Sequence, residues 1–208
     1  MIEDAVILQK MQRFGTFLSK CLSEKSASDL LQDLVKFPEG FDSRVFSFTG
    51  EADCGVLYQG DGLSNFDFVF LPDTIKIQGK GIILSNTCDL DLDNNKATQR
   101  VIVYAPIFNL KKWQERLSNE KGPIFAEQFV RKIRRQEIAQ LFYLPHSTKT
   151  KEEAFVDLAQ INHCARETVT ENQIKEDRLF SLNNTGFYVL LFKISVFYCR
   201  LQEGIDRG

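Results

Sequence analysis

Residues 81 to 107, GIILSNTCDLDLDNNKATQRVIVYAPI, place an apolar run on each side of a polar segment. Both runs are rich in Ile and Val, and such β-branched residues favour strands. Asn94 and Asn95 tolerate positive φ, so we expect them to form the turn of a hairpin. This stretch therefore predicts two neighbouring antiparallel strands.

The strand pattern continues toward the N-terminus of this stretch. Between residues 44 and 81 the sequence holds four more short runs of strand character, RVFSF, GVLY, FDFVFL and TIKI, separated by Gly, Asp, Asn and Pro clusters. No helical periodicity interrupts them. Six short strands with close turns predict a small antiparallel sheet that curls into a barrel.

Helical periodicity flanks this region on both sides. One amphipathic segment covers residues 2–22, and another begins after Ser26 or Ser28 and ends at Phe37-Pro38. After Pro106, helical spacing recurs at 110–117, 124–141, 152–167 and 186–199. We therefore expect an α+β fold in a single domain, residues 1–208, with helices at 1–37, a β-barrel at 44–107 and a mainly helical part at 108–208.

Composition indicates an ordinary globular protein with an aromatic core. The 208 residues are 43% hydrophobic and include 18 phenylalanines. The five cysteines are widely spaced and form no C-x-x-C pair, which argues against a disulfide scaffold and against a zinc finger. The N-terminal segment lacks the pattern of a signal peptide. We expect a cytoplasmic protein with reduced thiols and no cofactor.

The C-terminal segment GFYVLLFKISVFYC, residues 186–199, is the most apolar of the chain. It is shorter than the roughly 20 residues that a membrane span needs, and Lys193 interrupts it, so we expect no membrane insertion. Its apolar side chains lie on two flanks of the predicted helix. Such a helix is covered either by the core or by a partner protein or second copy of the chain.

The charge is unevenly distributed. A net charge of −2 argues against a protein built mainly to neutralise phosphates. Residues 111–135 nevertheless hold eight Lys or Arg against three Glu, and Arg131, Lys132, Arg134 and Arg135 form a cluster. These four residues are candidates for binding nucleic acid or an acidic partner, although such a run also suits a solvated helix face.

The polar segment after the first strand carries three alternating carboxylates. In an extended chain Asp89, Asp91 and Asp93 point to one side, where they could hold a hard cation such as Mg²⁺. The spacing also resembles an EF-hand loop, but Asn94 and Arg100 replace its glycine and its bidentate glutamate. The simpler interpretation is a turn without a metal.

Cys88 and Asp89 stand where the first strand ends. We expect Cys88 to be a buried structural thiol, because small buried cysteines commonly fill cores. Asp89 is expected to accept hydrogen bonds from backbone amides at the strand end, as in an Asx-turn. A catalytic Cys88 would require the fold to bring His146 or His163 close to it.

Three segments carry a resemblance to a known family. YQGD at 58–61, GIILSN at 81–86 and VIVYAPI at 101–107 resemble the core of the MazF/PemK/Kid-type toxins, which have an SH3-like barrel. The resemblance implies dimeric, ribosome-independent endoribonucleases. The family's catalytic Arg-Pro is replaced by Lys80-Gly81, and Phe108 stands where the family has Thr or Ser.

Two functions follow as hypotheses. The first is a non-catalytic protein-interaction subunit of a bacterial defence or toxin-antitoxin module, for example in phage defence, with a protein partner or a second copy bound through the C-terminal helix. The alternative is an endoribonuclease or metal-dependent nuclease on a MazF-like barrel, with Lys80, Arg100 or the basic helix contacting phosphates. Whether the chain is an enzyme is left open by its sequence.

Overall fold

The computed structural model describes residues 23–38, 41–47, 55–72, 74–94, 97–146 and 151–198. The chain divides into two compact units, residues 1–41 and 42–208, and each is described by itself. The predicted helix over residues 2–22 lies outside the described residues.

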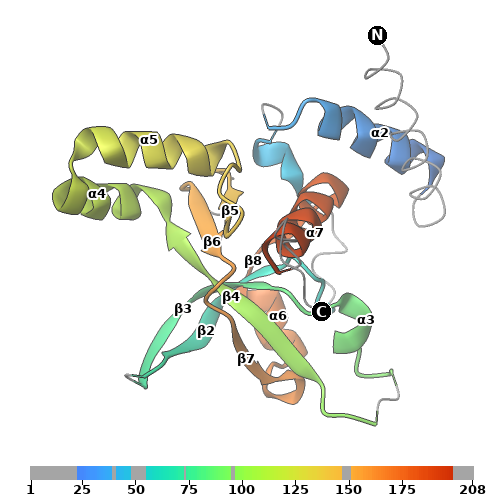
Figure 1. Ribbon diagram of the computed structural model, residues 1–208. Helices are drawn as coiled ribbons and strands as arrows, with labels where there is room; N and C mark the ends of the chain where they lie inside the picture. The colour runs from blue at the N-terminus through green and yellow to red at the C-terminus, as the bar shows by residue number, and fades with distance from the viewer. Residues whose placement is uncertain are drawn as a thin grey trace, which may run out of the picture. The chain divides into compact units, whose positions relative to one another are not determined.

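The described part of the first unit contains helix α2, Glu24–Val35 (Figure 1). The Ser23 hydroxyl oxygen accepts a hydrogen bond from the Ser26 amide at 3.2 Å, as an N-cap side chain does. The helix therefore begins slightly before the predicted caps. Its predicted end before Phe37-Pro38 is confirmed.

The second unit combines strands and helices along its whole length (Figure 1). Its strands are β1 (Phe46–Ser47), β2 (Gly62–Phe70), β3 (Ile75–Ile83), β4 (Val101–Asn109), β5 (Leu141–Leu144), β6 (Ala154–Asp157), β7 (Asn162–Ala165) and β8 (Arg178–Leu182). Its helices are α3 (Thr87–Leu90), α4 (Leu110–Lys121), α5 (Pro123–Arg134), α6 (Glu171–Asp177) and α7 (Asn184–Tyr198), with 3-10 turns η1 (Ser43–Val45) and η3 (Arg166–Thr168).

The strands form one antiparallel sheet in the order β1-β8-β2-β3-β4-β6-β5, with β7 paired to β4. Strand β4 is central because it pairs with β7 through residues 101–104, with β3 through 104–106 and with β6 through 107–109. The predicted α+β class with an antiparallel sheet and flanking helices is confirmed. A closed SH3-like barrel is not confirmed, because the sheet is an open path from β1 to β5.

The C-terminal part contains more strands than its sequence pattern predicts. The expected helix over residues 152–167 is wrong, since this segment forms β6 and β7. Each of these strands is four residues long, too short for side-chain periodicity to distinguish it from a helix. Pairing with β4 determines their conformation, as tertiary context commonly overrides local propensity.

Helices α4 and α5 follow directly from local sequence signals. The Asn109 side chain accepts a hydrogen bond from the Lys112 amide at 2.8 Å and caps α4. Gly122, with φ of +89°, ends α4, and Pro123 occupies the first turn of α5, where its missing amide hydrogen costs nothing. The predicted helix over 124–141 ends early, at Arg134, because the chain then turns into β5.

The core is aromatic, as the composition predicts. The ring of Phe66 stacks on Tyr104 with centroids 4.0 Å apart, and Phe68 meets Tyr104 edge-on at 5.2 Å. A Cβ atom at Gly81 would lie 2.6 Å from the Phe66 ring. A glycine is needed there because the ring of β2 lies directly over the backbone of β3.

Candidate functional site

The turn before β2 contains a buried ion pair. Asp61 is 0% exposed, and its Oδ2 lies 3.1 Å from Nη2 of Arg178, the first residue of β8. The Tyr58 amide donates a second hydrogen bond to Oδ2 at 2.9 Å, and Arg178 also donates to the Val56 carbonyl. Burial raises the pKa of Asp61, while the charge of Arg178 opposes that shift. The pair ties this turn to β8.

The polar segment after β3 lies against the same turn. Gln59 joins them, since its amide donates to the Thr87 hydroxyl at 3.0 Å and its side chain donates to the Leu84 carbonyl at 2.7 Å. The Gly60 amide donates to the Ile83 carbonyl at 2.8 Å. The turn that contains Asp61 and the polar segment that contains Asp89, Asp91 and Asp93 are therefore neighbours in the fold. We call them the two acidic segments.

The segment following β3 forms the short helix α3 instead of an extended run. The Asn86 side chain accepts a hydrogen bond from the Cys88 amide at 2.9 Å and caps this helix. Cys88 and Asp89 are exposed, and Leu90 is the residue that reaches the core. The prediction of a buried Cys88 is wrong. Asn86 caps this helix, and the hydrogen-bonding role predicted for Asp89 stays a prediction.

Arg100 binds the backbone of the residues that follow α3. Its side chain donates to the carbonyls of Asp91 and Leu92, each at 3.0 Å. The Asp91 carboxylate accepts a hydrogen bond from the Asp93 amide at 3.0 Å, which forms an Asx-turn. The predicted turn at Asn94-Asn95 extends beyond the described residues.

The three predicted metal ligands do not converge. Asp89 lies in α3, Asp91 ends that helix, and Asp93 follows in a turn, so the expected alternation on one side of a strand is absent. Among the described residues, no group of three or more His, Cys, Asp or Glu side chains is placed to hold a metal ion.

Arg134 of the predicted basic cluster is engaged within the protein. Its Nε and Nη2 donate to the two carboxylate oxygens of Glu153 at 2.9 and 2.7 Å, which is a two-point ion pair. The Tyr143 hydroxyl donates to the same carboxylate. Hydrogen bonding from Arg134 holds the pKa of Glu153 below its usual value. This arrangement fastens α5 to the segment before β6.

The other three members of the cluster lie on the surface of the same region. Arg135 forms an exposed ion pair with Glu137 at 3.0 Å. Arg131 and Lys132 are exposed in the last turn of α5. The cluster is thus divided between side chains held by glutamates and side chains open to solvent.

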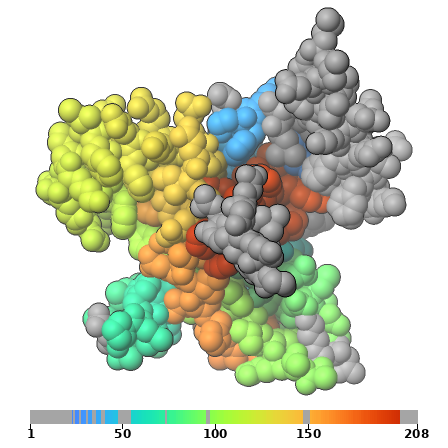
Figure 2. Space-filling view, in the orientation of Figure 1, coloured from blue at the N-terminus to red at the C-terminus, as the bar shows by residue number. Residues whose placement is uncertain are grey.

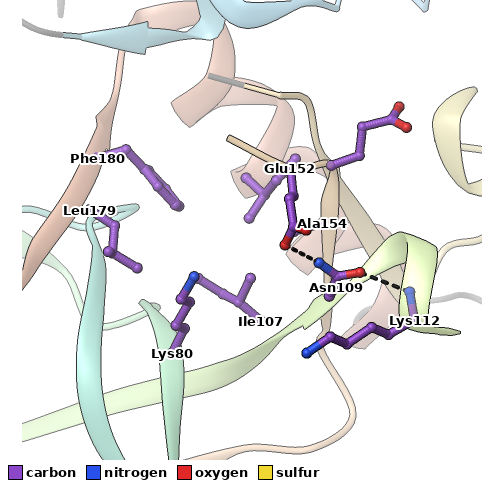
Figure 3. Close-up of a pocket in the computed structure, with 10 residues that line it drawn as sticks. Lys80, Ile107, Asn109, Lys112, Glu152, Ala154, Leu179 and Phe180 are labelled. Atoms are coloured by element: carbon purple, nitrogen blue, oxygen red, sulfur yellow. Dashed lines mark hydrogen bonds between the residues drawn. The ribbon is translucent and has the colours of Figure 1, made fainter. Parts of the chain in front are cut away.

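A hollow of about 210 Å³ lies where β3, β4, β6 and β8 approach one another (Figure 3). Ile107, Leu179 and Phe180 form part of its apolar lining, and Lys80 and Lys112 contribute ammonium groups. A second hollow of about 560 Å³ adjoins it, because Glu152 and Glu153 line both. Lys80 in the first hollow and Arg134 in the second are the lining residues that the sequence also suggested.

The β2–β3 hairpin extends away from the rest of the sheet (Figures 1 and 2). Its register places Phe68 opposite Ile77 and Phe70 opposite Ile75, so these four side chains share one face. Phe68 is buried in the core, whereas Ile77 and Ile75 are 50% and 56% exposed, and Leu71 at the tip is 80% exposed. We call this the hairpin stripe: Phe70, Leu71, Ile75 and Ile77.

Helix α7 matches the expectation of a helix with apolar residues on two flanks. Val189 and Leu190 are buried, and Phe192 is 64% exposed. Lys193 is buried and donates to the carbonyls of Gln136 and Ile138, and burial lowers its pKa to about 8. Among the described residues no helix is both long and apolar enough to cross a membrane.

The sequence was also compared with known proteins. It matches no protein-family model, and no curated protein matches it.

The strongest interactions at these sites escape sequence analysis because their partners are distant. Gly60 and Asp61 are residue types that favour the turn found before β2, but Arg178 follows Asp61 117 positions later, in a stretch with no strand signal. The lysines of the hollows come from three separate segments. Asp61 lies between two glycines and before an apolar strand. Among these residues it is the one whose local sequence indicates a structural role.

Proposed function

We propose that this chain is a non-catalytic protein-interaction subunit of a bacterial defence or toxin-antitoxin module. The observation that carries the proposal is the hairpin stripe, in which Phe70, Ile75 and Ile77 continue the buried face of β2 into solvent and Leu71 lies exposed at the tip. Large exposed apolar patches on a folded protein commonly mark interaction surfaces. The stripe is therefore the surface to which a partner protein binds.

The energetics favour burial of the stripe. Full burial of a Leu or Ile side chain contributes about 1.5–3 kcal/mol. Leu71, Ile75 and Ile77 are half exposed or more, so a partner that covers them gains several such contributions. Such a surface suits a partner with an apolar groove.

Helix α7 supplies a second apolar surface. Phe192 is 64% exposed and lies about one helical turn from the buried Val189. The sequence-based proposal of a partner contact through this helix is retained, with Phe192 as its centre. Aromatic side chains are enriched among the residues that dominate binding energy.

The non-catalytic part of the proposal draws on the toxin resemblance. Phe108, at the position of the family's Thr or Ser, packs against Phe155 with ring centroids 5.5 Å apart and against Trp113 at 6.0 Å. An aromatic ring in that cluster stabilises the β4–α4 junction and supplies no hydroxyl. The Lys80-Gly81 pair likewise lacks the family's arginine.

The test uses two matched substitutions on opposite faces of one hairpin. Ile77→Gln alters the stripe, and Val69→Gln alters a similarly exposed β-branched residue on the other face. The chain is co-expressed with the products of its neighbouring genes, and complexes and self-association are measured by analytical ultracentrifugation. We expect Ile77→Gln to weaken the complex about tenfold, which corresponds to roughly 1.4 kcal/mol, and Val69→Gln to have little effect.

A strictly monomeric chain that forms no complex with any of these proteins contradicts the proposal. Equal weakening by both substitutions contradicts the assignment of the stripe. Thermal unfolding of each variant verifies that the fold is retained.

A further inference from the structure

Four lysines from three separate segments line the two adjoining hollows. Lys80 from β3 and Lys112 from α4 line the first, and Lys111 and Lys151 line the second. Figure 3 shows Lys80 and Lys112 on either side of Ile107. In the described part of the chain, none of these four ammonium groups forms an ion pair.

The two glutamates of the hollows are already engaged. Glu153 is held by Arg134 and Tyr143. Glu152 accepts a hydrogen bond from the side chain of Asn109, whose other side-chain atom caps α4. Neither carboxylate therefore pairs with a lysine.

The balance of charge around the hollows is positive. Arg134 and the four lysines supply five positive charges against the two glutamates, which leaves a net charge of +3. In the sequence as a whole the net charge is −2, so this surface differs in sign from the average of the chain. Clustered like charges repel, and an anion that binds among them relieves that repulsion.

We propose that the two hollows form a binding site for a phosphate ester or anhydride. Lysine ammonium groups bind phosphate oxygens as mobile point charges. The apolar lining from Ile107 and Phe180 accommodates an organic group attached to the phosphate. A free nucleotide and the backbone of a nucleic-acid strand share this chemistry.

The backbone at Lys151 is consistent with a binding role. Its φ is +53°, a conformation that non-glycine residues adopt at some energetic cost. Such conformations cluster at ligand-binding sites. Here the conformation precedes Glu152 and Glu153, which line both hollows.

The experiment measures binding of two probes to the full chain. ATP binding is measured by calorimetry, and binding of a short fluorescent single-stranded RNA by anisotropy, each at about 50 and 200 mM salt. We expect Lys80→Gln and Lys112→Gln each to weaken binding about fivefold, and the double variant to weaken it more than tenfold. For RNA, each substitution is also expected to lower the salt dependence by about one unit of slope.

Matched controls separate this site from general surface charge. Lys175→Gln removes an exposed lysine of α6 outside the hollows and is expected to leave binding unchanged. Lys132→Gln removes an exposed lysine of α5, also outside the hollows, and is likewise expected to leave binding unchanged.

Binding of ATP but not RNA identifies a free nucleotide as the ligand, and binding of RNA but not ATP identifies a nucleic-acid backbone. Failure of both probes to bind at the lower salt concentration overturns the proposal. Equal losses in Lys80→Gln and Lys175→Gln also overturn it. Both results are independent of the hairpin stripe, so they leave the proposed interaction function untouched.

Discussion

Two acidic segments lie side by side in this fold, and their carboxylates differ in burial. Asp61 is buried and paired with Arg178, whereas Asp89, Asp91 and Asp93 are exposed. Both segments flank apolar strands, and the second has more carboxylates. The difference shows that burial of a carboxylate depends on whether a distant cation reaches it, and not on local acidic density.

The largest expected effect follows from removing the buried charge. Asp61→Asn removes the carboxylate charge that pairs with the Arg178 guanidinium, in a site where the Arg178 side chain is only 4% exposed. Loss of one partner from a buried ion pair typically costs about 3–5 kcal/mol. We expect a loss of that size in the free energy of unfolding, measured by urea denaturation.

The double variant Asp61→Leu with Arg178→Met provides the control. It removes both charges and keeps apolar volume, so we expect it to be more stable than Asp61→Asn alone. A cost below about 1 kcal/mol for Asp61→Asn would show that water reaches the pair, and would remove the contrast between the two segments.

The contrast between the two acidic segments explains which parts of the fold can be predicted from the sequence. Local signals are sufficient for α4, because Asn109 and Gly122 determine its ends, and for α7, because its apolar residues continue for several turns. They are insufficient for β6 and β7, whose strand conformation depends on pairing with β4.

The same limit applies to the candidate sites. The turn at Gly60-Asp61-Gly62 is visible in the sequence, but the burial of Asp61 depends on Arg178 from β8. The alternating pattern of residues 88–93 is equally visible and leads to the wrong geometry, because the Asn86 cap starts a helical turn. An alternation of apolar and acidic residues over six positions does not exclude a helical turn.

A smaller effect is expected from the cap of α3. Asn86→Ala removes the side chain that accepts the Cys88 amide hydrogen bond, and loss of such a cap typically costs about 1 kcal/mol. The matched variant Asp89→Ala changes an exposed position in the same helix, where substitutions usually stay within about 0.5 kcal/mol. Urea denaturation of both variants measures the difference. If Asp89→Ala proves the more destabilising of the two, the capping role returns to Asp89.

The smallest expected effect concerns Cys88, the thiol next to the cap. Its exposure implies that Cys88→Ser changes the free energy of unfolding by less than about 0.5 kcal/mol. Cys164 is half-buried, and burial raises the pKa of its thiol, which lowers the thiolate fraction that reacts with alkylating reagents. Under native conditions we therefore expect iodoacetamide to label Cys88 faster than Cys164, as followed by peptide mass spectrometry. Slow labelling of Cys88, together with a large cost for Cys88→Ser, would mean that this segment packs into the core after all, and the two acidic segments would then be alike in burial.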